Sequence, residues 1–351
     1  MTMHDSQVLN RIFMLSERMI VFDGLDDVFE HIVKTAVALT HAEAATIRIF
    51  DMDSGNIEIV KGFGVTEGFL SQPPIRIGEG ITGRVVQTGK PFYSPEISIE
   101  PACKNAELAQ LEGIRSIICV PMKTRESAIG SISVYRKTNE PFEQHEMLIL
   151  SIFAAEAVQA VEKARLLQEL HKQATYDPLT GLYNKRAFMQ KLTAEMDRSI
   201  RNNQPLSLLF LDLDHFKKFN DQHGHLMGDK MIHDFTSILK QHCRKIDIVG
   251  RFGGDEFVIC APQTDYEGAK TLANKLLETV RGQRFLSSKL DQYFQTTSSI
   301  GVAVSYPNEP MVIEELLERA DKALYESKHK GRDCYSIAPQ TPVSKAIISQ
   351  D

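Results

Sequence analysis

The sequence predicts an α+β fold with two α/β-type domains joined by one long helix. The chain has 351 residues, which is long for a single hydrophobic core and suits two. Short strand-like runs alternate with amphipathic helical stretches in both halves, whereas the stretch between them has neither proline nor glycine. We therefore expect a first domain at residues 1–150, a connecting helix at 151–174, a second domain at 175–337 and a disordered tail at 338–351.

The first domain is predicted to be an antiparallel sheet with helices. Amphipathic helical patterns at 8–20 and 25–39 come first, and strand-like runs at 45–50 and 57–60 follow. Ser54-Gly55-Asn56 lies between these two runs, so together they predict a hairpin. Two further strand-like runs stand at 116–120 and 128–135, which completes a pattern typical of an α+β domain.

The connecting segment, from about Glu146 to Ala174, carries a heptad repeat. Its seam positions are spaced alternately four and three residues apart: Phe153, Ala157, Ala160, Ala164, Leu167, His171 and Ala174. Such a repeat favours a two-stranded parallel coiled coil, in which small alanines would make the pairing weak and adjustable. The alternative is a single amphipathic helix that packs on its own domain.

The composition is that of an ordinary globular protein, with 42% hydrophobic and 25% charged residues. The formal net charge of -6 disfavours binding to a nucleic acid polymer, since duplex-binding proteins more often carry a basic surplus. No signal peptide or bilayer-spanning stretch is recognisable, so we expect a cytoplasmic protein without membrane insertion. The five cysteines are scattered, which predicts free thiols and no zinc site.

The second domain is predicted to have a βαββαβ core with flanking helices. Its strongest strand is the nearly continuous apolar run at 206–211, which is typical of a buried central strand. A helix at 228–243 follows, and then a hairpin of strands 247–252 and 257–261 with Gly253-Gly254-Asp255-Glu256 at its tip. The order ends with a helix, a strand and a helix at 269–280, 298–304 and 312–328.

Acidic residues stand where the elements of this core end. Asp212 and Asp214 follow the buried strand, and alternation places them on the same side of it. A buried carboxylate needs a cation, and a pair of carboxylates suggests a hard divalent metal such as Mg²⁺. The alternative for this pair alone is two helix-capping aspartates. A hairpin paired beside the strand would bring Asp255 and Glu256 to the same point, and a metal there suits phosphoryl or nucleotidyl transfer.

Six motifs of the second half together resemble the GGDEF domain of diguanylate cyclases. They stand in family order and at family spacing, at residues 177–186, 212–217, 220–229, 251–257, 320–325 and 328–332. The resemblance covers about Thr175 to Tyr335 and implies a core similar to the palm of nucleotide cyclases. It implies condensation of two GTP molecules into cyclic di-GMP and two pyrophosphates. It also implies a homodimer, because each domain binds one GTP and presents the 3′-hydroxyl to the other's α-phosphate.

The same resemblance implies which residues act at the reacting centre. Mg²⁺ or Mn²⁺ would be held by Asp212, Asp255 and the Leu213 carbonyl. Asp255 or Glu256 would help to deprotonate the ribose 3′-hydroxyl, and we favour Asp255 with Glu256 as a supporting acid. Lys217 would stabilise the charge that develops on the phosphates.

GTP itself is expected to contact six further residues: Phe216, Asn220, His225, Asp229, Lys328 and Arg332. The backbone amides of His215 and Phe216 would meet the phosphates, and the cationic side chains of Lys328 and Arg332 would bind the outer ones. Guanine would be recognised by Asn220 and Asp229, with His225 supporting that end of the pocket. A carboxylate accepts from both guanine N1–H and the 2-amino group, and adenine offers no such pair of donors.

A second site is suggested by Arg244 and Asp247, which stand five residues before the signature like the RxxD inhibitory site of the family. Arg244 would bind phosphate or a guanine edge, Asp247 would accept from guanine, and Arg251 would contribute. Cyclic di-GMP is then expected to inhibit noncompetitively. One alternative is a surface ion pair. Another is a receptor without enzymatic activity that binds cyclic di-GMP here, and a third is a dimeric scaffold.

The first half resembles a GAF sensory domain, on Gly78–Gly83, Thr88–Pro91, Gly113–Ser116, Val120–Met122 and Ile129-Gly130. The segment 78–83 also matches a dinucleotide-binding GxGxxG, but its surroundings are not βαβ units and we do not favour that interpretation. The resemblance covers about residues 25–164. It implies regulation of the second half, with an unidentified small ligand enclosed under residues 92–111. The alternative is a dimerisation module without a ligand.

Overall fold

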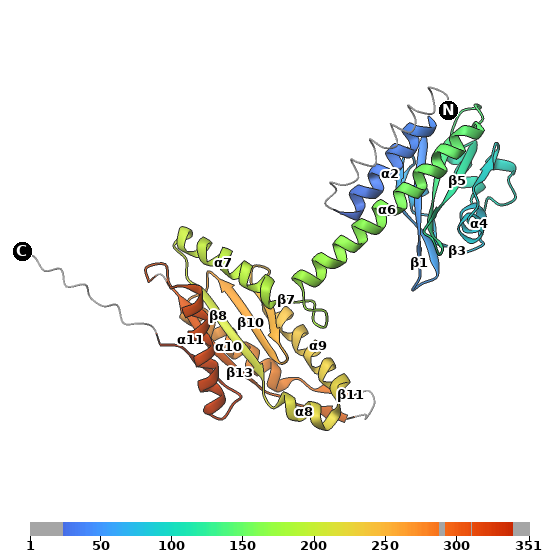
Figure 1. The fold of residues 1–351 in the computed structure, drawn as a ribbon. Helices are drawn as coiled ribbons and strands as arrows, with labels where there is room; N and C mark the ends of the chain where they lie inside the picture. Colours follow the sequence, from blue (N-terminus) through green and yellow to red (C-terminus); the bar gives the residue numbers. More distant parts are fainter. Residues whose placement is uncertain (1–23, 288–291, 310, 340–351) are drawn as a thin grey trace, which may run out of the picture. The chain divides into compact units, whose positions relative to one another are not determined.

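The computed structural model describes residues 24–287, 292–309 and 311–339. The helix expected at 8–20, and the expected tail from 340 onward, lie outside the described residues. The chain divides into two compact units, Met1–Glu169 and Leu170–Asp351. Each unit is a sheet with helices packed on it, so the predicted α+β fold class is confirmed (Figure 1). The residue limits expected for the domains stay a prediction.

The first unit is built on a six-stranded antiparallel sheet in the order β3-β2-β1-β6-β5-β4. Its strands are β1 (Ala44–Asp51), β2 (Asn56–Phe63), β3 (Ile75–Arg76), β4 (Phe92–Ser94), β5 (Ser116–Lys123) and β6 (Ala128–Arg136). The predicted hairpin is confirmed, because Asp51 of β1 stands opposite Asn56 of β2. The short strands β3 and β4, which sequence patterning did not predict, close the two edges of the sheet.

Helices cover both faces of this sheet (Figure 1). On one face, α2 (Leu25–Thr40) and α6 (Gln144–Thr175) pack on alternate strand residues such as Ile47, Ile118 and Ile132. The other face is covered by α3 (Glu67–Leu70), α4 (Gly80–Thr88), the 3₁₀ turn Ile97–Ile99 and α5 (Ala106–Leu111). The strand before α4 is β3, which pairs antiparallel to β2, so the segment 78–83 is not in a βαβ unit.

Helix α6 runs without interruption through the division between the two units. The first seam residues, Phe153 and Ala157, are buried in the core of the first unit against the sheet. This part of the heptad repeat therefore packs on its own domain, as the alternative interpretation has it. Further along, Leu166, Leu167 and Leu170 are exposed.

The second unit also has a six-stranded sheet, in the order β14-β13-β8-β10-β9-β7. Its strands are β7 (Tyr183–Asn184), β8 (Leu206–Leu213), β9 (Ile248–Gly253), β10 (Glu256–Pro262), β13 (Ser298–Ser305) and β14 (Tyr335–Ile337). A separate two-stranded ribbon is formed by β11 (Phe285–Ser287) and β12 (Gln292–Phe294). The predicted central strand is confirmed, because every residue of β8 is buried and β8 pairs antiparallel with β10 and β13.

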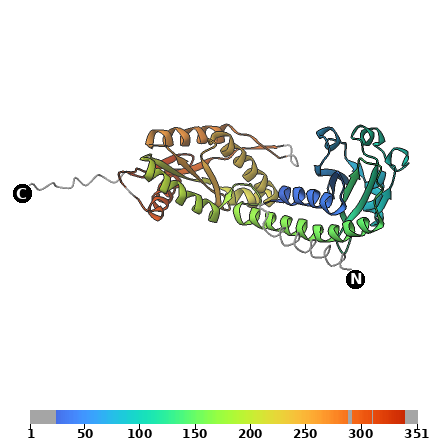
Figure 2. The same cartoon turned by 90° about the horizontal axis from the view of Figure 1, so that it is seen from above.

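Helices pack on both faces of this sheet (Figure 2), and alternate residues of β8 belong to two different hydrophobic clusters. Leu209 and Leu211 face α9 (His225–His242) and α10 (Tyr266–Gly282). Leu208 and Phe210 face α7 (Lys185–Asn202) and α11 (Ile313–His329). The end of β8 leads directly into α8 (Phe216–His223), so this end of the sheet meets the start of a helix.

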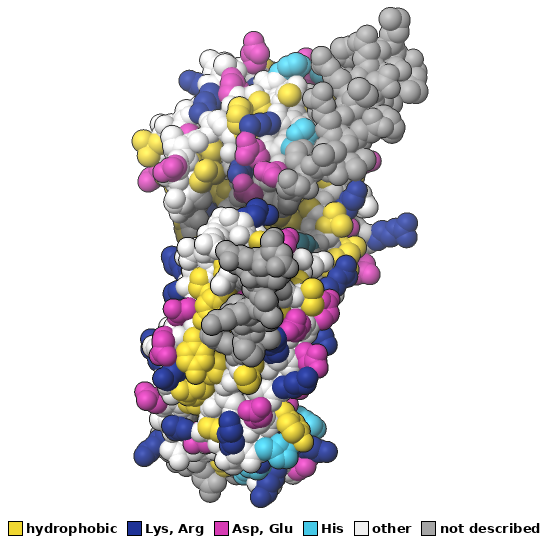
Figure 3. Space-filling view, turned by 90° about the vertical axis from the view of Figure 1, so that its left-hand side faces the viewer, with side chains coloured by type: hydrophobic (Ala, Val, Ile, Leu, Met, Phe, Trp, Pro, Cys, Tyr) yellow, Lys and Arg dark blue, Asp and Glu magenta, His cyan; other side chains and the backbone are white. Residues whose placement is uncertain are grey.

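Basic and acidic side chains are interspersed over the face shown in Figure 3. The five cysteines all lie in the described part of the chain and are free thiols. Within residues 24–287, 292–309 and 311–339, we find no helix whose length and apolar character together suffice to span a bilayer.

Candidate functional site

The antiparallel pairing of β10 with β8 brings the hairpin tip beside Asp212. Glu256 stands directly opposite Asp212 in the register, and the Leu213 amide donates to the Asp255 carbonyl at 3.3 Å. Gly254 adopts a φ of +37°, a region that favours glycine, which explains its place in the turn. The structure thus brings together Asp212, Leu213, Asp255 and Glu256, which the sequence assigned to metal binding and catalysis.

Asp212 interacts with several charged side chains of this site: it contacts Lys328, and the charges of Asp255 and Glu256 act on it. Its Oδ2 lies 2.7 Å from Lys328 Nζ. Burial raises its pKa to about 6, Lys328 opposes that rise, and the charges of Asp255 and Glu256 add to it. The anionic form of Asp212 is therefore disfavoured by its surroundings, and a further cation at this point would stabilise it.

The oxygen atoms available here suit a hard divalent cation. One or two carboxylates and a backbone carbonyl are a sufficient protein contribution for Mg²⁺, which keeps waters and substrate phosphates as its other ligands. A complete set supplied by side chains is not present: within the described residues, no three His, Cys, Asp or Glu form a group that could hold a metal. The site fits a metal that arrives with a phosphorylated substrate.

Asp214 was expected to lie beside Asp212 and to share the metal with it, but its carboxylate is occupied by other partners. Its carboxylate accepts from Ser299 Oγ and Thr297 Oγ1, both at 2.7 Å, and from the Asp333 amide at 3.1 Å. Period-two alternation gives the same side of a strand but does not say which neighbours lie there. Asp214 therefore anchors β13 and the segment after α11.

Two short elements after β8 carry most of the residues predicted to bind nucleotide. Lys217 and Asn220 lie on α8, whose core-facing residue is the buried Phe216. His225 and Asp229 lie in the first turns of α9 and are exposed, as is Lys217. Gly224, with a φ of +83°, forms the tight junction between the two helices.

Asn220 is held against Gly228 of α9. A Cβ added to Gly228 would lie 1.8 Å from Asn220 Oδ1, so only glycine leaves room for the amide. The same Oδ1 is buried and has no hydrogen-bond partner within the described residues. The structure thus places an unused acceptor at the junction of α8 and α9, one helical turn from Asp229.

Lys328 and Arg332 come from the end of α11 and the turn after it. Lys328 pairs with Asp212, whereas Arg332 Nε lies 4.0 Å from Asp214 Oδ1 with 42% of its side chain exposed. Arg332 and Asp333 both have positive φ, at 67° and 49°. This turn directs both cations toward the end of β8.

Arg244 and Asp247 form an ion pair, the alternative that sequence patterning left open. Arg244 Nη2 lies 3.0 Å from Asp247 Oδ1, and it also donates to Thr264 Oγ1 at 2.6 Å and to the Pro262 carbonyl at 3.1 Å. Half of the Arg244 side chain, 51%, is nevertheless exposed. The pair is preformed and presents one side of its guanidinium to solvent.

Arg251 has a role that sequence reasoning missed. Its Nη1 donates to both Asp177 oxygens, at 3.0 and 3.2 Å, and its Nη2 donates to the Gly254 carbonyl at 2.7 Å. Asp177 also accepts from the Thr180 hydroxyl at 2.6 Å. Arg251 therefore braces the signature turn against the segment that follows α6. The signal in the sequence is Asp177, an acid at the start of the first motif that needs a cationic partner.

Family models match both units. Residues 23–162 match the GAF domain, and residues 174–334 match the family described as diguanylate cyclase, GGDEF domain. Both matches agree with the resemblances read from the sequence.

Relatives with names match mainly the second half. Diguanylate cyclase DgcS of Shewanella oneidensis is 37% identical over 182 residues, which cover 52% of this chain and 59% of that protein. Diguanylate cyclase DgcP of Pseudomonas aeruginosa is 37% identical over 172 residues, which cover 49% of this chain and 25% of that protein.

A solved structure of the coiled coil and GGDEF domain of DgcB from Caulobacter crescentus, in complex with c-di-GMP, is 31% identical. That match has a TM-score of 0.48 and covers 54% of this chain and 99% of the other. The chain spans between a quarter and three fifths of the two curated relatives named above. The chain contains a GAF domain followed by a GGDEF domain of the diguanylate cyclase type.

Proposed function

We propose that the protein is a diguanylate cyclase, which condenses two GTP molecules into cyclic di-GMP and two pyrophosphates. The observation that carries the proposal is the register of β10 on β8, which sets Glu256 opposite the buried Asp212 with Asp255 adjoining Leu213. Asp212, Asp255 and Glu256 stand at the positions that the resemblance assigns to the reaction. The names of the relatives, diguanylate cyclases DgcS and DgcP, support the same activity.

Asp212, Asp255 and the Leu213 carbonyl are the proposed ligands of Mg²⁺ or Mn²⁺. A divalent cation bound there would neutralise phosphate oxygens and acidify a coordinated hydroxyl. Asp212 supports this assignment because its pKa is raised by burial and by the two neighbouring acids, so its anionic form lacks sufficient compensation from Lys328 alone.

The reaction forms two phosphodiester bonds, and each of them is made by the same step. The 3′-oxygen of one GTP attacks the α-phosphorus of the other, pyrophosphate leaves, and the 3′-hydroxyl proton passes to Asp255, with Glu256 supporting it. Lys217 and the amides of His215 and Phe216 lie at the N-terminal end of α8, where helix geometry favours phosphate. Lys328 and Arg332 approach from the turn after α11 and are proposed to bind the outer phosphates.

Guanine is proposed to bind between α8 and α9. Asn220 offers a buried oxygen without a partner, and Asp229 offers an exposed carboxylate. Both are acceptors, and guanine N1–H and the 2-amino group are donors on one edge of the base. His225, in the first turn of α9, would support this end of the pocket.

The reaction needs two domains facing each other, so we propose a homodimer. Helix α6 supplies a surface for it, because Leu166, Leu167 and Leu170 are 62%, 54% and 52% exposed. Large exposed leucines repeated along one helix are typical of a partner-binding surface. Pairing here, after Ala164, leaves the earlier seam residues in the GAF core.

We propose that the GAF domain regulates the cyclase through α6. The helix is buried in the GAF core at Leu150 and Phe153, and its last carbonyls are bound in the second unit by Asn184, whose Nδ2 donates to Ala174 O at 2.9 Å. Arg251 then joins the Asp177 segment to the signature turn. Hydrogen bonds therefore link the end of α6, through Asn184 and Arg251, to the turn that carries the acids, and a displacement of α6 would act on that turn. The limits 1–150, 151–174 and 175–337 are the proposed sensory, connecting and catalytic segments.

Product inhibition is proposed at Arg244 and Asp247. The exposed half of Arg244 offers donors to a phosphate or a guanine edge of cyclic di-GMP. The Asp247 side chain is only 2% exposed and accepts from Arg244, so it would have to turn outward to accept from guanine. Arg251 already donates to Asp177 and to the Gly254 carbonyl, so it would contact cyclic di-GMP only through N–H groups that these bonds leave unused.

The replacement Asp255→Ala tests the proposed function. It is expected to abolish formation of cyclic di-GMP while leaving the melting temperature and dimer unchanged, because Asp255 lies on an exposed turn. Full turnover by a folded Asp255→Ala dimer would overturn the assignment of the site. Retained binding of cyclic di-GMP without turnover in the unaltered chain would instead favour the receptor alternative.

A further inference from the structure

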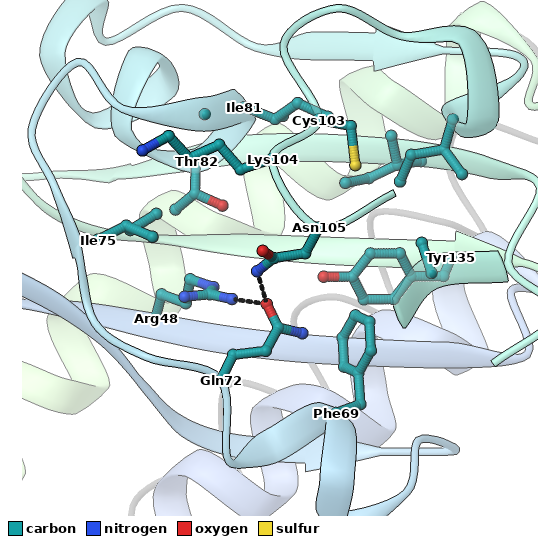
Figure 4. Close-up of a pocket in the computed structure, with 14 residues that line it drawn as sticks. Arg48, Phe69, Gln72, Ile75, Ile81, Thr82, Cys103, Lys104, Asn105 and Tyr135 are labelled. Carbon is teal, nitrogen blue, oxygen red and sulfur yellow. Dashed lines mark hydrogen bonds between the residues drawn. The ribbon is translucent and has the colours of Figure 1, made fainter. Parts of the chain in front are cut away.

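A small cavity of about 70 Å³ lies in the first unit, under α4 and the segment that leads to α5 (Figure 4). Its volume is enough for several atoms of the size of a water molecule. Apolar side chains form part of the wall, among them Phe69, Ile81 and Ile117. The polar part is formed by Arg48, Gln72 and Asn105, which point toward one another across the cavity.

Arg48 is buried without a counter-charge. It lies on β1 and only 6% of it is exposed. Its Nη2 donates to Gln72 Oε1 at 2.9 Å, but its Nη1 is buried and has no hydrogen-bond partner within the described residues. Burial lowers the pKa of Arg48, and the side chains that oppose this are Tyr135 and Cys119, neither of them a carboxylate.

Next to Arg48 lie buried hydrogen-bond donors that have no acceptor within the described residues. Gln72 Oε1 accepts from both Arg48 and Asn105 Nδ2, at 2.9 and 2.7 Å, which fixes the orientation of the Gln72 amide. Its Nε2 is then a buried donor without a partner. Ser131, directly opposite Arg48 in the β1–β6 register, has a buried hydroxyl that is also without one. Unused donors cluster here, and no Asp or Glu lines the cavity.

The second buried arginine of this unit shows how such a group is normally satisfied. Arg136 is 7% exposed, like Arg48. It donates to the Pro141 carbonyl at 2.6 Å, to the Thr40 carbonyl at 3.0 Å and to Glu146 Oε1 at 2.7 Å. Within the described residues, Arg48 donates only to the Gln72 side chain and has neither a carboxylate nor a backbone carbonyl as a partner. A buried unpaired charge is costly, so a partner from outside the chain would account for Arg48.

We propose that this cavity binds a small organic carboxylate, with the carboxylate group on Arg48 and Gln72 and a short apolar part against Phe69 and Ile81. A guanidinium matches a carboxylate in both charge and planar geometry. The apolar wall favours an organic acid over an inorganic anion, which has nothing to place there. The inference rests on the contacts of the first unit and does not depend on the proposed cyclase activity.

The test uses the full chain and propionate as the probe. Sodium propionate is compared with propionamide, its neutral isostere, and with sodium chloride at equal ionic strength, by calorimetric melting and by amide hydrogen exchange in residues 44–51. Propionate is expected to raise the melting temperature of the first unit saturably, by about 2–4 °C, and to slow exchange in β1. Equal effects of propionate and propionamide would overturn the proposal. An effect of chloride as large as that of propionate would assign the site to inorganic anions and would overturn it too.

Two variants locate the effect. Arg48→Met keeps the length of the side chain but removes the charge and the donors, so the response to propionate is expected to vanish. Without ligand, the melting temperature of this variant should be no lower than that of the unaltered chain. The melting temperature of Arg136→Met should be lower, because that change leaves the buried Glu146 carboxylate without its cationic partner. An undiminished propionate response in folded Arg48→Met would contradict the proposal. Should Arg48→Met not fold, the comparison of propionate with propionamide in the unaltered chain still decides it.

Discussion

Lys328 Nζ lies 2.7 Å from Asp212 Oδ2, and this contact ties the end of α11 to the end of the central strand β8. The two residues have different proposed partners, since Asp212 is assigned to the metal and Lys328 to the outer phosphates of GTP. Their ion pair therefore has to be exchanged when the metal–nucleotide complex binds. Until then Lys328 offsets part of the cost of burying the Asp212 carboxylate.

Asp212→Asn is expected to lower the cyclase rate by about a thousandfold or more, because the metal contributes several kcal/mol to the stabilisation of the reacting phosphate. The free energy of unfolding of the second unit should not fall, and above about pH 6 it should rise, since burial and the neighbouring acids disfavour the Asp212 anion that the variant removes. Product formation and calorimetric melting are measured on the same preparation.

Asp214→Ala is the matched control for that variant. It removes the acceptor of Ser299 and Thr297 and should lower the free energy of unfolding by about 2–4 kcal/mol. The account predicts opposite profiles for the two neighbouring aspartates. A variant of Asp212 that unfolds as readily as Asp214→Ala would show that Asp212 is structural.

Gly228→Ala is expected to raise the KM for GTP about tenfold and to weaken the preference for GTP over ATP. The added Cβ would lie 1.8 Å from Asn220 Oδ1, so the amide must move away from the place proposed for guanine. One lost hydrogen bond to the base corresponds to about that factor. Gly282→Ala, at the end of α10, is the control, because nothing lies within 4 Å of its added Cβ. Similar steady-state constants for both variants would refute the placement of guanine.

The two arginines near the signature should respond differently. Arg244→Ala should leave the initial rate nearly unchanged and should relieve inhibition by added cyclic di-GMP. Arg251→Ala should instead lower the initial rate and the melting temperature, because it leaves Asp177 without its guanidinium and frees the Gly254 carbonyl. Inhibition curves that coincide for Arg244→Ala and the unaltered chain would exclude this inhibitory site.

Leu167→Glu and Leu170→Glu are expected to weaken the dimer. Both leucines are more than half exposed, so the changes should not affect folding of the single chain. Activity should fall at low protein concentration and recover at high concentration, as sedimentation shows the dimer returning. Lys172→Glu on the same helix serves as a charge-change control, because Lys172 is exposed and lies on the opposite face from these leucines. Activity that falls without any change in sedimentation would argue against pairing through α6.

Local patterns predicted the elements that carry the candidate site where one element decided the outcome. The apolar run of β8 and the glycine turn at Gly253-Gly254 needed no distant information, and their pairing brought the acids together. Contacts between distant elements were not readable in the same way. A heptad stripe has the same spacing whether it faces a partner helix or its own sheet, so the burial of Phe153 in the GAF core could not be separated from a coiled coil.

Arg48 shows the same limit in the sensory domain. A polar residue at an alternate strand position is typical of a solvent-facing strand. Only α4 and the segment before α5, which lie far along the chain, turn that face into a wall of a cavity. Likewise Asp214 was expected on the same side as Asp212, but it is bonded to Ser299 of β13 and to Thr297 just before that strand, more than eighty residues away.

The most direct test of the central claim is product analysis of the 351-residue chain, with its dimerisation checked by sedimentation, after incubation with GTP and Mg²⁺. Cyclic di-GMP and pyrophosphate are quantified by chromatography, with ATP and a metal-free reaction as controls. The account predicts two pyrophosphates for each cyclic di-GMP, formed from GTP alone and only with the divalent metal. A confirmed dimer that forms no cyclic di-GMP under these conditions would contradict it.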